Sequence, residues 1–276
     1  MAITAKQVNE LRQITGAGMM DCKKALVEAE GDIEKAIDLL RKKGQKVAAK
    51  RADREASEGN VYSYISEDGT VGIAFGLNCE TEPVSNTEEF KKLGETALKV
   101  AIENSVTSKE ALVDIEVEGK KLAEHMVELS GKIGEKIEIS DYAYVKGEQV
   151  VDYLHGTSIV VLVSLAGGTG EEVVEAGKNV AMQIAAMKPL AVDKDGIDPE
   201  VVEREKQVGI EKAREEGKPE HILDKIAQGF VQKFFKDNTL LSQQYVKEPK
   251  QSVAQYLDSV KKGLTVKSFS RIGIGR

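Results

Sequence analysis

Apolar residues at helical spacing predict three short helices at the start of the chain. In the second of them, one buried face is formed at i, i+3, i+4 and i+7 by Cys22, Ala25, Leu26 and Ala29. In the third, the same pattern is formed by Ile33, Ala36, Ile37 and Leu40. Glycine accepts the left-handed conformation that ends many helices, so we expect helix ends near Gly16, Gly31 and Gly44. The pattern indicates a small helical domain over residues 1–45 and a basic linker helix over residues 46–58.

Strict alternation of apolar residues replaces the helical pattern in the next part of the chain. Every second position is apolar at Val71, Ile73, Phe75, Leu77 and Cys79, as in a strand with one buried face. Asp68-Gly69 separates this run from Val61–Ile65 and is typical of a tight turn. The pattern therefore predicts a β-hairpin. A helix with Phe90 and Ala101 on its buried face should follow, after a cap at Asn86.

The sequence of strand, turn and strand occurs twice. The segments that begin at Asn60 and Gln149 align when two residues are dropped, with the pairs Val61 and Val150, Tyr64 and Tyr153, Gly69 and Gly156. Each copy leads into a helix. We therefore predict an α+β fold with two repeated α/β subdomains, each an antiparallel sheet with helices on one side. The expected ranges are 59–140 for the first subdomain and 141–188 with 237–276 for the second.

Residues 189–236 interrupt the second subdomain with a strongly charged segment. Pro199 suits the first turn of a helix that follows Asp198, and Gly217-Lys218-Pro219 breaks the chain sharply. The second arm carries apolar residues at helical spacing, among them Leu223 and Phe230. We predict an inserted helical hairpin that projects as a short antiparallel coiled coil.

Composition narrows the functional classes. Charged residues make up 31% of the chain, its net charge is −7, and no apolar run reaches the length of a membrane helix. We expect a cytoplasmic protein that neither inserts into membranes nor binds nucleic acid in general. The basic residues of the linker, Arg51 and Arg54 among them, are interpreted as a solvated helix face. Contact of these residues with an acidic partner or RNA stays open.

No constellation of catalytic or metal-binding residues stands out in the sequence. The cysteines, Cys22 and Cys79, lack metal-ligand spacing, and the three histidines have no paired nucleophile. Gly177-Lys178-Asn179 lacks the upstream glycine and the hydroxyl of a phosphate-binding loop. We therefore expect no enzyme activity, no catalytic residues, no cofactor, no metal and no direct nucleotide binding.

Two segments are candidates for partner binding. Met19 and Met20 follow a glycine-containing turn, where flexible apolar side chains suit a partner surface. Either methionine can instead close the core of the helical domain, and one inward and one outward side chain is the expected compromise. The second candidate is the loop 78–86 between a buried strand and a helix, in which Pro83 should favour an extended Glu82.

Several strings in the chain resemble a known family. TGAGMMDCKKAL (15–26) and GDIEKAI (31–37) resemble a ubiquitin-associated-type domain, and more closely the amino-terminal domain of bacterial translation elongation factor Ts. Further matches are QIAAMKP (183–189) and KFFKDNTLLSQ (233–243), so the resemblance covers nearly the whole chain. It implies a guanine-nucleotide exchange factor that binds elongation factor Tu and promotes release of GDP.

The resemblance also implies contact residues for elongation factor Tu. In the amino-terminal domain these are Leu11, Met19 and Met20, and in the second subdomain His155 and Gly156. Family members typically carry Thr-Asp-Phe-Val in the loop that perturbs the magnesium and phosphate side of the Tu nucleotide site. This chain reads Thr81, Glu82, Pro83, Val84. The acid is retained with one more methylene, and the aromatic ring is replaced by proline.

A ubiquitin-associated-type adaptor or nascent-chain-binding protein is the alternative function. It accounts only for the segment from Ile3 to Gly44. An enzyme that uses Glu80, Glu82 or His155 has no supporting residue spacing. The exchange factor is therefore the interpretation that we carry forward.

Overall fold

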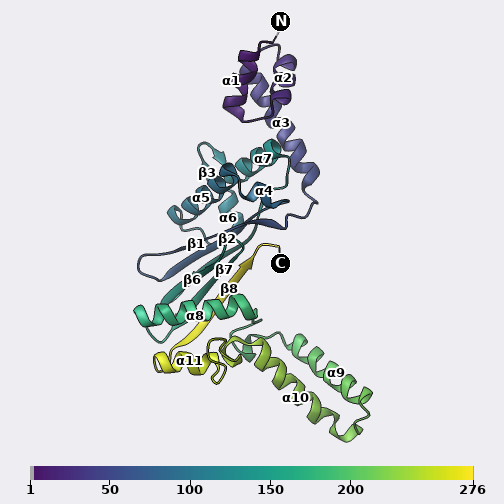
Figure 1. Ribbon diagram of the computed structural model, residues 1–276, viewed down its shortest axis with the longest axis vertical. Helices are drawn as coiled ribbons and strands as arrows, with labels where there is room; N and C mark the ends of the chain where they lie inside the picture. Colours follow the sequence, from purple (N-terminus) through teal and green to yellow (C-terminus); the bar gives the residue numbers. More distant parts are fainter. Residues whose placement is uncertain (1–2, 276) are drawn as a thin grey trace.

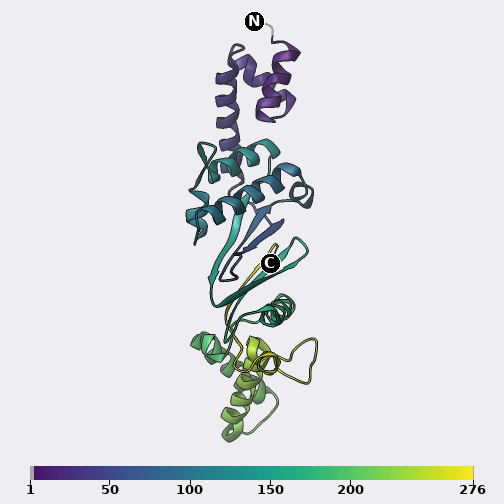
Figure 2. The ribbon, with the colours of Figure 1, turned by 90° about the vertical axis from the view of Figure 1, so that its left-hand side faces the viewer.

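The protein is elongated, with a helical module at one end and a helical hairpin at the other (Figures 1 and 2). The computed structural model describes residues 3–275. The module consists of α1 (Ala5–Thr15), α2 (Met19–Glu28) and the first part of α3 (Ile33–Arg51). Its core is formed by buried residues that include Val8, Leu11, Cys22, Leu26 and Ala36. The three predicted helices are confirmed, and the thiol of Cys22 lies inside this core, 0% exposed.

The third helix does not end at Gly44, as the sequence suggested. It continues to Arg51, so most of the predicted linker is the second half of α3. Gly44 is buried at the contact between α3 and α7 (Leu122–Ile133), where it faces Gly131. The close approach of the two backbones explains why glycine occurs here within a helix rather than at its end.

The first three-stranded sheet follows α3. Its strands β1 (Glu58–Ile65), β2 (Val71–Cys79) and β5 (Glu138–Lys146) are antiparallel, in the order β1-β2-β5. The predicted hairpin is confirmed, and Gly69 in its turn has a φ of 68°. Helices α5 (Glu88–Glu103) and α7 cover the outer face of this sheet. The N-cap of α5 is Thr87, one residue after the expected Asn86. Between β2 and α7 lie also α4 (Glu82–Ser85), α6 (Lys109–Val113), β3 (Glu116–Val117) and β4 (Lys120–Lys121).

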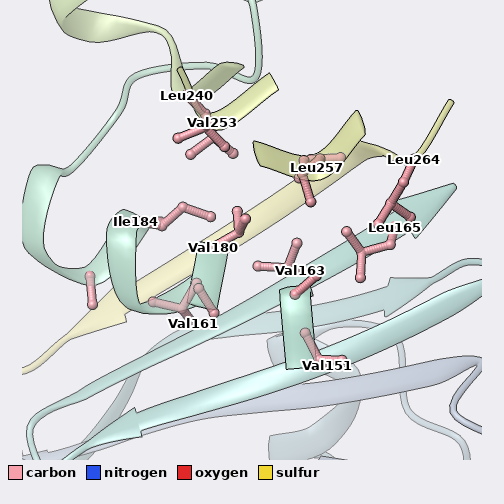
Figure 3. Close-up of a cluster of buried hydrophobic side chains, with 14 of the residues drawn as sticks. Val151, Val161, Val163, Leu165, Val180, Ile184, Leu240, Val253, Leu257 and Leu264 are labelled. Atoms are coloured by element: carbon pink, nitrogen blue, oxygen red, sulfur yellow. The ribbon is translucent and has the colours of Figure 1, made fainter. Parts of the chain in front are cut away.

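The second sheet repeats this plan. Strands β6 (Gln149–His155), β7 (Ile159–Ala166) and β8 (Thr265–Gly273) are antiparallel, in the order β6-β7-β8. Helices α8 (Glu171–Met187) and α11 (Val253–Val260) cover its outer face. Figure 3 shows their side chains meeting those of the sheet, for example Val180 and Leu257 with Val163 and Leu165.

The inner faces of the two sheets pack against each other. The contact consists of aliphatic residues, namely Val61, Ala74, Ala143, Val160, Leu162, Ile272 and Ile274. The core thus has four layers, with helices outside and two sheets inside (Figure 1). Burial of both faces explains why β7 is apolar at nearly every position.

The two sheets have the same strand order, but the predicted alignment of their second strands is shifted by one residue. Tyr64 pairs with Ile73 in the first sheet, and Tyr153 pairs with Val161 in the second. Ile73 and Val161 are therefore equivalent, whereas the alignment of Gly69 with Gly156 matches Ile73 with Val160. Val160 points to the opposite face, because a slip of one residue inverts every side chain of a strand.

The predicted helical hairpin is confirmed as α9 (Pro199–Glu215) and α10 (Glu220–Asn238). Asp198 caps α9 by accepting a hydrogen bond from the backbone N–H of Glu200. The Lys212 ammonium lies 5.0 Å from the centre of the Phe230 ring and links the two helices. Single 3₁₀ turns, Lys194–Gly196 and Leu240–Ser242, flank the hairpin. Over residues 3–275, no helix is both long and apolar enough to cross a membrane.

Candidate partner-binding site

The chain turns sharply after β2, and this turn carries the segment of Thr81, Glu82, Pro83 and Val84. We call residues 80–84 the corner. The sequence suggested a loop with an extended Glu82, but Glu82 begins the short helix α4 and Pro83 lies in its first turn. The extended residue is Thr81, with φ −135° and ψ 147°. Proline is accepted in the first helical turn because its missing N–H has no partner there in any case.

The carboxylate of Glu135 holds the backbone of the corner. It accepts hydrogen bonds from the backbone N–H groups of Glu80 at 3.2 Å and Thr81 at 3.0 Å. The hydroxyl of Thr81 donates a third hydrogen bond to Glu135, at 2.7 Å. Sequence reasoning missed Glu135, which belongs to no periodic pattern and follows a helix end.

The carboxylate of Glu80 ties the corner to α3. It accepts hydrogen bonds from Arg51 at 2.9 and 3.2 Å, from Arg54 at 3.0 Å and from the backbone N–H of Lys136 at 2.7 Å. Burial favours the neutral acid, but these hydrogen bonds outweigh it and lower the pKa of Glu80 to about 2. The guanidinium groups of Arg51 and Arg54, which the sequence left open for an acidic partner or RNA, thus bind a carboxylate of the same chain.

Val84 attaches the corner to the hydrophobic core of the first sheet. Its side chain is 8% exposed and packs in the core of the first sheet, so its expected role as a surface contact is wrong for the free chain. Cys79 is buried beside it, and burial raises the pKa of its thiol to about 12. Glu82 and Pro83 remain exposed above these two residues. The corner therefore presents one carboxylate and one rigid apolar ring to the surroundings.

A hollow separates the corner from the turn between β6 and β7. Its lining comes from both sheets and comprises Ser57, Glu58, Gly59, Glu82, Ser85, Asn86, Thr157, Ser158, Ile274 and Gly275. Strand β1 bridges the two sides, because Asn60 donates a side-chain hydrogen bond to the Ser85 carbonyl and Val61 donates its N–H to the Thr157 carbonyl, each at 2.8 Å. The structure therefore brings Glu82 close to the β6–β7 turn, which the sequence does not show.

His155 and Gly156 begin this turn. Gly156 has a φ of 59°, as expected for a hairpin turn. His155 is exposed, and its Nδ1 lies 3.1 Å from the hydroxyl oxygen of Tyr153. The preceding residue, Leu154, is 47% exposed and was not singled out from the sequence. Thr157 and Ser158 of this turn line the hollow, and the end of β6 before them presents an exposed imidazole and an exposed apolar side chain.

The helical module presents a second, separate surface. Met19 and Met20 lie in the first turn of α2, not in a loop, and are 53% and 63% exposed. The expected compromise of one inward and one outward methionine is therefore wrong. Leu11 is 0% exposed, so it is a core residue of the module and not a surface contact. Ile14, near the end of α1, is also 57% exposed and was not singled out from the sequence.

We call the exposed side chains of Met19 and Met20 the methionine edge. Helix α2, which carries them, and α4, which begins within the corner, lie in different parts of the molecule (Figure 1). They are joined by α3, which starts in the module and ends at Arg51, beside Glu80. The structure thus gathers the predicted residues into two groups. Met19 and Met20 form one, and Glu82, Pro83 and the β6–β7 turn form the other.

Comparisons with known proteins identify the family. The profile described as "Elongation factor TS" matches residues 80–276. The elongation factor Ts of Cytophaga hutchinsonii is 52% identical over 99% of both chains. That of Amoebophilus asiaticus is 49% identical over the full length of both. The chain belongs to the elongation factor Ts family. Membership gives it the role of a nucleotide exchange factor in translation elongation.

The extent of the match bears on the alternative function. The elongation factor Ts profile begins at Glu80, the first residue of the corner, and covers β5 of the first sheet, the whole second sheet and the hairpin. An adaptor built around the helical module does not account for similarity over this region. The elongation factor Ts relatives also span the module, since their alignments cover 99% or more of this chain.

Proposed function

We propose that the chain binds elongation factor Tu and accelerates release of GDP by inserting the corner at the nucleotide site. The observation that carries this proposal is the contrast within the corner. Its backbone is held by Glu135 and Glu80, whereas Glu82 and Pro83 stay exposed. A segment fixed before binding loses little conformational entropy on insertion, so more of the interaction energy acts on the partner.

Exchange requires a coupling free energy and no catalytic group. If binding of this chain weakens binding of GDP, GDP weakens binding of this chain by the same factor. The carboxylate of Glu82 supplies this coupling, because a negative charge near the bound magnesium ion competes with the phosphates for it. Pro83 supplies a rigid apolar body in place of the aromatic ring typical of the family.

The two other groups of residues supply affinity. Met19 and Met20 form an apolar, adaptable edge that suits docking on a partner domain. The β6–β7 turn lines the hollow opposite Glu82 through Thr157 and Ser158, and with His155 and Gly156 it contacts a second part of Tu. Thr81 acts through its hydrogen bonds to Glu135 and Val84 acts through its burial. Both therefore orient the corner.

Stopped-flow release of fluorescent GDP from the cognate elongation factor Tu tests the proposal. The chain should raise the release rate in a saturable manner, with a maximal rate and a half-saturating concentration. Without Tu, the purified chain should not retain labelled GDP. An unchanged release rate at saturating chain would overturn the proposed function, and so would tight GDP binding by the chain alone.

A further inference from the structure

Helix α3 contacts α7 so closely that a single methyl group decides the fit. A Cβ atom on Gly131 would lie only 2.3 Å from the Cα atom of Gly44, which is far inside van der Waals contact. A Cβ atom on Gly44 would have Gly131 Cα as its nearest neighbour, at 3.5 Å, an ordinary contact. The packing of the two helices therefore depends on glycine at position 131 and tolerates alanine at position 44.

The turn of the helical module also rests on α7. The Lys132 side chain lies directly against Gly16, where an added Cβ would meet it, and donates a hydrogen bond to Glu89 at 2.9 Å. Within the module, Lys43 of α3 pairs with Asp21 of α2. The segment around Met19 is thus held by two contacts, one from Lys43 of α3 and one from Lys132 of α7.

The far end of α3 is fixed at the corner. Arg51 and Arg54 both bind the Glu80 carboxylate, which lies next to Thr81 in the chain and is 14% exposed. This carboxylate also accepts the backbone N–H of Lys136, so it joins α3, the corner and the start of β5. The Nη1 of Arg51 donates to both oxygens of this carboxylate, and the Nη1 of Arg54 donates to one of them. Two charge-assisted contacts at the end of α3 therefore constrain its direction.

We infer that α3 is a fixed arm, in which Gly131 and Glu80 are positioning residues that hold the methionine edge and the corner at one separation and orientation. This inference rests on the proposed function and deepens it. A partner that contacts both surfaces then binds the second one without a further loss of freedom. Release of the arm lowers affinity and leaves the chemistry of the corner intact.

The kinetic test uses two matched pairs of variants. Gly131→Ala displaces α3, and Gly44→Ala makes the same change at the same contact without a clash. Glu80→Gln weakens the ion pairs and keeps an acceptor for Lys136, and Glu103→Gln removes an exposed carboxylate that lies 3.8 Å from the Lys99 ammonium. Melting temperatures verify that each variant is folded. Alanine also has a higher helix propensity than glycine in the last turn of α7, so Gly131→Ala should fold.

The expected result is a change in one kinetic parameter only. Gly131→Ala and Glu80→Gln should each raise the half-saturating concentration for GDP release by about tenfold, which corresponds to about 1.4 kcal/mol. For Gly131→Ala, which lies outside the corner, the maximal rate should stay within about twofold of the native chain, because residues 80–84 are all unchanged. Gly44→Ala and Glu103→Gln should behave like the native chain.

A second measurement does not require Tu. Spin labels at Lys24→Cys on α2 and Lys92→Cys on α5 occupy exposed positions, whereas the two native thiols are buried. Double electron–electron resonance should give a narrow distance distribution in the native background. Gly131→Ala and Glu80→Gln should broaden or displace it, and Gly44→Ala should not.

The outcomes separate the inference from the proposed function. A distance distribution that stays both narrow and unshifted in Gly131→Ala and in Glu80→Gln would overturn the fixed arm, whatever the exchange rates. A loss of maximal rate in Gly131→Ala with an unchanged half-saturating concentration would also overturn it, because a residue outside the corner would then act on the corner itself. If the native chain did not accelerate GDP release, the proposed function would fail while the distance measurement still tested the arm.

Discussion

The two repeats of the core make the same chain reversal in different ways. After β2, the chain enters α4, and the Glu135 carboxylate binds the backbone N–H of Thr81. After β7, the chain passes through Gly167, Gly168 and Gly170, all with positive φ, before α8. A carboxylate serves there too, since Glu148 accepts the N–H of Gly167 at 3.0 Å.

The difference shows where a binding surface can be built. In the second repeat, a Cβ on Gly167 would lie 2.4 Å from the Gly263 carbonyl oxygen, so this connection has no space for a side chain there. In the first repeat, side chains hold the backbone, and the connection can therefore carry Glu82 and Pro83 at the surface. The repeat architecture is shared, and the exposed chemistry is added to only one copy.

The largest expected effect tests whether the repeats form one folding unit. Phe75 is 0% exposed and stacks with Tyr62 and Tyr142, with ring centres 5.2 and 6.3 Å apart. Phe75→Ala should lower the free energy of unfolding by about 3–5 kcal/mol, and Leu165→Ala in the second sheet by about 2–5 kcal/mol. Because the sheets share a core, urea unfolding of each variant should show a single transition of both sheets. A separate transition of one sheet would show that the repeats are independent.

The next effect concerns the exposed chemistry of the first connection. Glu82→Ala with Pro83→Ala should reduce the coupling between this chain and GDP on Tu by about 1 kcal/mol, roughly a fivefold change in affinity. Thr169→Ala is the matched control, an exposed position in the corresponding connection of the second repeat. Stopped-flow GDP release measures both. If Thr169→Ala slowed GDP release as much as the double variant, the two connections would not differ in function.

An effect of similar size, which disappears in acid, is the pH-dependent contribution of Glu80 to stability. Its pKa is lowered from 4.5 to about 2 in the folded chain. Ionised Glu80 therefore stabilises the fold fully above pH 4.5, and this contribution is lost as the pH falls toward 2. Glu80→Gln should cost about 1 kcal/mol at neutral pH, because Arg54 is exposed and solvent weakens its pairing. Chemical denaturation at several pH values should show the difference shrinking with acid.

Glu148→Gln is the control for this comparison. Glu148 is exposed and accepts a single backbone hydrogen bond at the second connection, so its replacement should cost less than about 0.5 kcal/mol. A cost equal to that of Glu80→Gln would mean that the two connections are held with similar strength.

The parts of the fold that depend on local pattern could be predicted from the sequence. Alternation gave the hairpin around Gly69, and helical spacing with caps gave α2, α5 and the α9–α10 hairpin. Gly44 was misinterpreted because glycine can mark either a helix end or a close helix contact. Only the position of Gly131 decides between the two. The predicted alignment of β7 is wrong because a strand that is buried on both faces shows no alternation of apolar and polar residues from which its register can be read.

The candidate site was predictable in its exposed residues but not in its support. Glu82 and Pro83 stood out from the sequence by family resemblance, and both are exposed. The residues that hold them come from distant segments, since Glu135 is 54 positions from Thr81 and Arg51 is 29 positions from Glu80. Hydrogen bonds over such separations leave no periodic signal in one sequence. Leu11 and Val84 were misplaced for a related reason, because an apolar residue in a binding motif can face either way.

The base of the α9–α10 hairpin has a consequence for how this protein can vary. Leu190 donates its N–H to the Asn238 carbonyl at 2.8 Å, and Leu240 donates its N–H to the Ala191 carbonyl at 2.9 Å. The chain thus leaves the core and returns to it at adjacent points, as at a closed stem. Evolution can lengthen, shorten or exchange what lies beyond this stem without altering the register of β8. The same stem offers a place to graft a foreign domain, such as a fluorescent reporter, onto an otherwise unchanged core.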